Sequence, residues 1–151
     1  MSTSSKAVPG PATILVIDDD PSVLTVVHCM LGTGGYNVLL APSAEVALRL
    51  VERNDLMIDL VLLDVVMPGV TGPELADRIL AIRPNLKVLF MSGFADAAVV
   101  RVKILDRKLE LLPKPFTSDG LLDVIERMLN APMHRSAAAG ANGASFFPFP
   151  R

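Results

Sequence analysis

The chain has very little cysteine and few aromatic side chains. Of its 151 residues, one is a cysteine (Cys29), one is a tyrosine and none is a tryptophan. A single cysteine excludes an internal disulfide framework and a zinc site built from several cysteines. The chain also has no large excess of charge of one sign, because it contains 14 Lys and Arg residues and 16 Asp and Glu residues. This near-neutral balance gives no support to direct nucleic-acid binding.

Long hydrophobic runs are also missing. Charges or prolines interrupt every apolar run well short of the ~18 residues that a transmembrane helix needs, so we expect no membrane insertion. The first twelve residues contain one lysine and no apolar stretch of the kind found in signal peptides. These absences predict a cytoplasmic protein.

Most of the chain has the composition of a folded domain. Hydrophobic residues make up 51% and charged residues 20% of the sequence, and the length is that of one domain. The exceptions are residues 1–12 and 131–151, which are rich in Ala, Gly, Ser and Pro. We expect a flexible N-terminal segment, a folded unit over 13–130 and a disordered tail. The tail carries Phe146, Phe147 and Phe149, which suit either a docking peptide or a simple disordered end.

Within the folded unit, short apolar runs alternate with helical patterns. Strands are expected at 14–17, 36–40, 58–65, 87–91 and 110–112. Helices are expected from Pro21 to Gly34, from Ser43 to Val51, and over 72–83, 96–105 and 117–129. This alternation predicts an α/β fold, an open doubly wound parallel sheet of five strands with helices on both faces.

The first helix has a mixed composition. Its pattern assigns Val23, Val26, Val27 and Met30 to the apolar side. Cys29 is then expected to be a small buried thiol, and His28 a partly exposed imidazole. Neither is predicted to take part in chemistry.

Polar residues follow four of the predicted strands. Asp18, Asp19 and Asp20 follow the first strand, Asp64 ends the third, Ser92-Gly93 follows the fourth and Lys114-Pro115 the fifth. In a doubly wound sheet these carboxyl ends share one edge, where binding sites lie. Several neighbouring carboxylates need a counter-charge, which Mg²⁺ supplies with oxygen ligands. A nearby lysine and hydroxyl would bind an anion, so the set predicts phosphoryl transfer. Asp20 is interpreted as a helix cap, and Asp59 as a surface or capping residue.

These motifs resemble the receiver domains of two-component response regulators. The resemblance covers about residues 13–130, through Ile14–Pro21, Leu62–Gly69 with Gly72, Met91–Gly93 and Pro113–Phe116. It implies a flavodoxin-like sheet with strand order 2-1-3-4-5.

The resemblance also implies roles for the acidic residues. Asp64 would accept a phosphoryl group from a histidine kinase or a histidine phosphotransfer protein. Asp19 would bind Mg²⁺ directly, Asp18 through water, and Asp64 and the backbone carbonyl of Val66 would complete the protein ligands.

Further roles follow for the later strand ends. Ser92 and Lys114 would bind the phosphoryl group, Gly93 would leave room for the donor, and the bond before Pro115 would be cis. Many receivers carry Tyr or Phe where this chain has Leu111, so a switch based on an aromatic rotamer is in doubt. The output face is expected on the helix over 97–105.

Two rival functions, and two settings for the receiver itself, remain open at this point. A haloacid-dehalogenase-type phosphohydrolase would use Asp18 as its nucleophile with Asp20 beside it, but this leaves Asp64 unexplained. A phosphorylation-independent scaffold would not need the complete Asp, Ser and Lys set. The receiver itself is expected either as a stand-alone regulator or as part of a hybrid histidine kinase.

Overall fold

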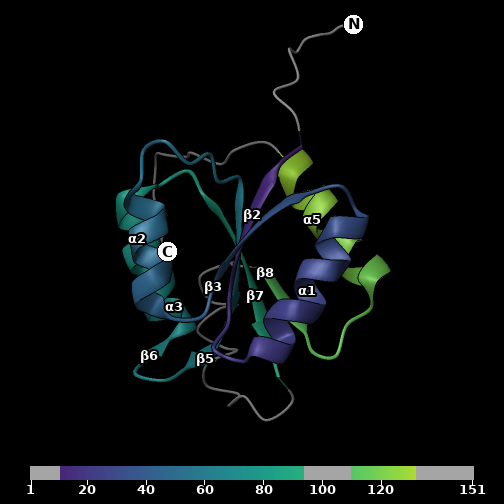
Figure 1. The fold of residues 1–151 in the computed structure, drawn as a ribbon, viewed down its shortest axis with the longest axis horizontal. Coiled ribbons are helices and arrows are strands. Elements are labelled where there is room, and N and C mark those ends of the chain that lie inside the picture. The colour runs from purple at the N-terminus through teal and green to yellow at the C-terminus, as the bar shows by residue number, and fades with distance from the viewer. Residues whose placement is uncertain (1–10, 94–109, 132–151) are drawn as a thin grey trace, which may run out of the picture.

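A computed structural model of the chain describes residues 11–93 and 110–131 (Figure 1). The helix predicted over 96–105, with its expected output face, lies outside the described residues. So do the predicted flexible segment up to residue 10 and the predicted disordered tail from residue 132.

The centre of the molecule is a five-stranded parallel sheet (Figure 1). Its strands are β2 (Thr13–Ile17), β3 (Asn37–Ala41), β4 (Leu60–Asp64), β7 (Lys87–Ser92) and β8 (Glu110–Pro113). They are arranged in the order β3-β2-β4-β7-β8. This is the predicted order 2-1-3-4-5, so the flavodoxin-like fold is confirmed.

Helices cover both faces of the sheet (Figure 1). One face carries α1 (Pro21–Thr33) and α5 (Ser118–Asn130), and the other carries α2 (Ala44–Glu52) and α3 (Gly72–Ile82). Each helix begins at a side chain that accepts a hydrogen bond from a free backbone N–H of its first turn; these caps are Asp20, Ser43, Thr71 and Thr117. Asp20 was expected as a cap from the sequence, and the second and last helices were expected to start at Ser43 and at residue 117.

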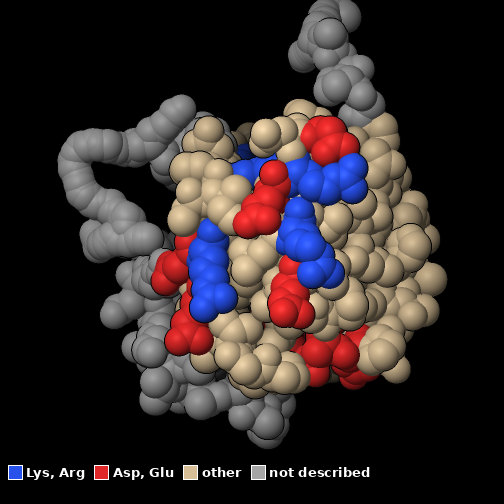
Figure 2. All heavy atoms as spheres, turned by 60° about the vertical axis from the view of Figure 1, so that its left-hand side comes forward, with Lys and Arg blue, Asp and Glu red and all other residues tan. Residues whose placement is uncertain are grey.

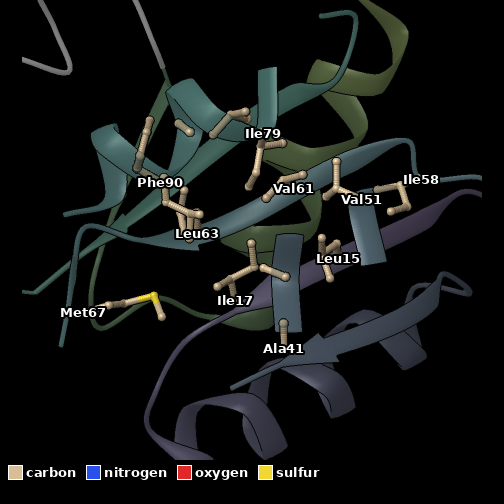
Figure 3. Close-up of a cluster of buried hydrophobic side chains, with 14 of the residues drawn as sticks. Leu15, Ile17, Ala41, Val51, Ile58, Val61, Leu63, Met67, Ile79 and Phe90 are labelled. Atoms are coloured by element: carbon tan, nitrogen blue, oxygen red, sulfur yellow. The ribbon is translucent and has the colours of Figure 1, made fainter. Parts of the chain in front are cut away.

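The strands are buried on both faces because their side chains alternate between two cores. Leu15, Ile17, Val61, Leu63 and Phe90 point towards α2 and α3 (Figure 3). Their neighbours in sequence pack under α1 and α5; they are Ile14, Val16, Leu60, Leu62, Leu89 and Met91. The continuous apolar runs seen in the sequence are therefore those of a sheet covered on both sides.

The predicted burial of α1 is wrong in two places. Cys29 is exposed and Val26 is 50% exposed. The buried residues are Leu24, Val27 and Leu31, which recur at helical spacing, whereas Val26 and Cys29 lie on the opposite side of the same helix. Because the helix carries apolar residues on most of its circumference, the sequence pattern did not distinguish the inner side.

A small hairpin follows β4 that the sequence analysis did not predict. β5 (Val66–Met67) pairs antiparallel with β6 (Val70–Thr71), and Gly69 adopts a φ of +80° in the turn between them. Gly72 then starts α3 against the backbone of β4: a Cβ there would lie 2.6 Å from the Asp64 carbonyl oxygen and 2.8 Å from the Val65 Cα. Only glycine allows this approach, which places α3 directly beside the residues that follow β4.

Replacing Gly72 by alanine is expected to lower the free energy of unfolding by about 1–3 kcal/mol, because backbone atoms must move apart. Gly32→Ala in α1 is the matched control. A Cβ at Gly32 meets nothing within 4 Å, so this change is expected to raise stability by about 0.5–1 kcal/mol. Urea denaturation of both variants measures the difference, and equal stabilities would contradict the proposed close approach.

Candidate functional site

Three carboxylates meet at the carboxyl edge of the sheet. Asp18 directly follows β2 and Asp64 is the last residue of β4, its neighbour in the sheet. One oxygen from each of Asp18, Asp19 and Asp64 lies within 4.8 Å of the others. Asp18 and Asp64 are buried and Asp19 is exposed, so the cluster has a covered base and one side open to solvent. The sequence analysis required this convergence, and the structure shows it.

Lys114 brings a positive charge to the buried part of the cluster. Its Nζ lies 3.3 Å from Asp18 Oδ2 and 3.5 Å from Asp64 Oδ1. The Lys114 side chain is 26% exposed, compared with 1% for Asp18 and 11% for Asp64. Lys114 was expected at this edge as a residue that binds the phosphoryl group. A direct contact with Asp18, 96 positions away in the sequence, was not predicted.

A backbone hydrogen bond connects Lys114 to Ser92. The Lys114 N–H donates to the Ser92 carbonyl at 2.7 Å, and the Lys114–Pro115 bond is cis. Ser92 is the last residue of β7 and is 4% exposed. Among the described residues, its hydroxyl contacts the carbonyl oxygen of Gly93 at a long distance of 3.4 Å. The two residues predicted to bind a phosphoryl group thus belong to adjacent, directly bonded strand ends.

Asp20 and Asp59 lie outside the cluster. Asp20 Oδ1 accepts the Ser22 N–H at 2.9 Å at the start of α1, and Asp59 Oδ2 accepts the Thr13 N–H at 2.8 Å. Both are exposed. They therefore cap the backbone, as the sequence analysis expected of them.

Among the described residues, Lys114 is the cation that pairs with the cluster. Burial of the Lys114 ammonium opposes its charged form, but the carboxylates of Asp64 and Asp18 outweigh this effect and raise the pKa of Lys114 above 10.5. Lys114 pairs with two of the three carboxylates. A divalent cation with oxygen ligands would offset further negative charge, and this donor set suits Mg²⁺.

Surface charge is mixed in sign on one side of the molecule. On the face formed by α2 and α3, basic and acidic side chains alternate (Figure 2), so that face lacks a continuous basic surface for nucleic acid. Within residues 11–93 and 110–131, no helix is both long and apolar enough to cross a bilayer.

Comparison with known proteins gives a family match. The sequence model of the response regulator receiver domain matches residues 14–126. The chain is 36% identical over 120 residues to the sensor kinase CckA of Brucella abortus, matching 80% of this chain and 13% of that protein. It is 40% identical over 121 residues to the DNA-binding transcriptional regulator NtrC of Azospirillum brasilense, matching 80% of this chain and 24% of the relative. The chain therefore spans about a quarter or less of these relatives.

A solved structure has the same fold over nearly its whole length. The crystal structure of a response regulator receiver domain protein from Clostridium thermocellum superposes with a TM-score of 0.71 and 31% sequence identity. The match covers 79% of this chain and 94% of that one.

Asp64→Asn is expected to lower the pKa of Lys114, because it removes the largest contribution that raises it. The measurement is an NMR titration of the Lys114 side chain in EDTA, with Asp55→Asn, a carboxylate paired only with Arg53, as the control. A raised pKa also means that the ion pairs stabilise the fold fully below pH 10.5, and that this contribution is lost as the pH rises through the folded-state value. An unchanged titration in Asp64→Asn would contradict the assignment.

Proposed function

This chain belongs to the response regulator receiver domain family, and we propose that its Asp64 is the residue that accepts the phosphoryl group. Receiver domains are phosphoacceptor signalling modules. The observation that supports Asp64 is its place in the carboxylate cluster, at the end of a central strand and 3.5 Å from Lys114. Its side chain is more covered than that of Asp19, but it lies at the base of the cluster, facing the lysine and the other acids.

Asp18, Asp19, Asp64 and the backbone carbonyl of Val66 would hold Mg²⁺. The first three supply carboxylate oxygens within 4.8 Å of one another, and Val66 begins the hairpin two residues after Asp64. When bound, Mg²⁺ neutralises the carboxylates and the charge on the transferred group, which lets an anionic donor approach.

The transfer exchanges one bond to phosphorus for another. A carboxylate oxygen of Asp64 forms the new O–P bond while the P–N bond of a donor phosphohistidine breaks, and the imidazole leaves with the bonding electron pair and takes up a proton. Gly93, without a side chain, leaves room for the donor beside Ser92. The donor class is a histidine kinase or a histidine phosphotransfer protein.

The phosphorylated state would be bound by Ser92 and Lys114. A phosphoryl group adds about −1.5 to −2 charge and three acceptor oxygens. The Ser92 hydroxyl, which makes a long contact with the Gly93 carbonyl, and the Lys114 ammonium would both turn to these oxygens. Since the two are joined by a backbone hydrogen bond, their movement would shift the ends of β7 and β8 together.

The output is a protein-interaction face or onward transfer of the phosphoryl group, in the cytoplasm and without substrate turnover. The larger proteins that this chain resembles include a sensor kinase and a transcriptional regulator, and both a stand-alone regulator and a part of a hybrid kinase fit the sequence. A haloacid-dehalogenase-type hydrolase is not favoured. It would need Asp20 at the site, and Asp20 instead caps α1.

Incubation with acetyl phosphate and Mg²⁺ is expected to add about one phosphoryl group per chain, in line with a single acceptor. Asp64→Asn should abolish labelling, since the nucleophilic oxygen is lost, while Asp59→Asn should label normally. Intact-protein mass spectrometry measures the added mass. Continuous release of phosphate that depends on Asp18 and persists in Asp64→Asn would instead identify a hydrolase.

Asp19→Asn is expected to reduce the same labelling about 100-fold or more, the scale of effect seen when a site loses a charge-stabilising group. Asp20→Asn is a matched control, since the neighbouring side chain keeps its capping oxygen and lies outside the cluster. EDTA should reduce labelling of the wild type as strongly as Asp19→Asn does. Full labelling in EDTA would contradict the proposed role of Mg²⁺.

A further inference from the structure

An open hollow lies at the amino end of the sheet, opposite to the carboxylate cluster. Its volume is about 320 Å³, and it is lined by Ile58, Arg83, Pro84, Asn85 and Leu86. These residues come from the segment that leads into β4 and from the turn between α3 and β7. The phosphoryl chemistry at the other end of the strands makes no use of it.

The hollow is lined by apolar residues together with Arg83. The Arg83 side chain donates from Nε to the Val51 carbonyl at 2.8 Å and from Nη1 to the Leu56 carbonyl at 2.9 Å. Its Nη2 donates to the carbonyl of Arg53. Because hydrogen bonds lie in the plane of a guanidinium group, an aromatic ring would meet Arg83 through a face of the group, in a cation–π contact.

Exposed apolar side chains adjoin the lining residues in sequence. Met57 is 76% exposed and Ile82 is 40% exposed, next to Ile58 and Arg83 respectively. They are two of the four large hydrophobic residues that are exposed in the described part of the chain. Apolar side chains are therefore exposed at two positions next in sequence to the lining residues.

The chain leaves the described domain at this same end. Lys87, which follows Leu86, donates from Nζ to the carbonyls of Met128 at 2.6 Å and Ala131 at 2.9 Å. These contacts hold the last turn of α5 at the amino end of the strands, beside the start of β2 in Figure 1. Residue 132 therefore continues from a fixed point close to the edge of the sheet where the hollow lies.

The sequence that follows has a composition suited to the hollow. Residues 132–151 contain three of the six phenylalanines of the chain, two of them next to Pro148, and no acidic residue. Phe146 comes fifteen positions after Ala131, and a Gly/Ser-type linker of fifteen residues would span roughly 20 Å on average. Residues 1–10 contain no aromatic side chain, so the C-terminal segment is the better match.

We propose that this hollow binds the segment Phe146–Phe149 of the same chain, with a phenylalanine ring against Arg83, Pro84 and Leu86. A contact of this size is weak between separate molecules. Within one chain, a short connection raises the effective concentration to about millimolar, which is enough to favour the bound state. The proposal does not depend on phosphorylation of Asp64.

The test compares the full chain with a variant in which Phe146, Phe147 and Phe149 are changed to serine, and uses Met133→Ser as the control. Amide hydrogen exchange of Leu56 and Leu86 should be about threefold slower in the wild type than in the triple variant, as for a site that is two-thirds occupied. The control should behave as the wild type. A peptide of residues 142–151, added to the triple variant, should shift the NMR signals of Ile58 and Leu86, and the same peptide with serine for phenylalanine should not.

Equal exchange in the wild type and the triple variant would overturn the proposal, and so would peptide shifts confined to another surface. Protection that grows with protein concentration would show that the segment of a second copy binds instead, and would overturn the intramolecular assignment. Labelling by acetyl phosphate, where the wild type shows it, should be unchanged in the triple variant. A loss of labelling would place the segment at the carboxylate cluster and contradict the proposal.

Discussion

The proposed function depends on three carboxylates and one lysine that meet at one edge of a buried sheet. Asp18 and Asp64 are covered because they end strands whose apolar residues pack on both faces, and such partly desolvated charges repel each other more strongly than they would in water. Lys114, which follows β8, offsets part of this repulsion. The proposal that this edge binds a cation and then a phosphoryl group rests on this local concentration of carboxylates.

Parallel strand pairing brings these charged and polar residues to one edge of the sheet. Asp18 and Asp64 are brought together by the pairing of β2 with β4, and Ser92 joins them because β7 pairs with β4 on its other side. Apolar packing on both faces of the sheet holds the strand ends in place, so the positions of the acids do not depend on attraction between the charges. Ligands that bind only this folded arrangement would stabilise it in turn.

The sequence predicts the strands and the starts of most helices because these depend on local patterns: apolar runs, capping side chains, and glycine or proline at the ends. The strand order came instead from the resemblance to receiver domains. The convergence of Asp18, Asp19 and Asp64 follows from strand order alone. Other features lack such a signal. The inner side of α1 depends on which of many apolar residues meet the sheet, so Val26 and Cys29 were misplaced. The contact of Lys114 with Asp18 depends on a side-chain rotamer, which no spacing predicts.

Leu111 bears on how a change at the site would travel. It lies opposite Phe90 in the pairing of β8 with β7 and is partly buried against the core under α2 and α3. A leucine has no ring to turn and no hydroxyl to donate, so it cannot report a phosphoryl group by exchanging one hydrogen-bonded position for another. The backbone bond between Lys114 and Ser92 remains. Under the proposed function, displacement of these two bonded strand ends is a physical route by which phosphorylation of Asp64 would reach the surface.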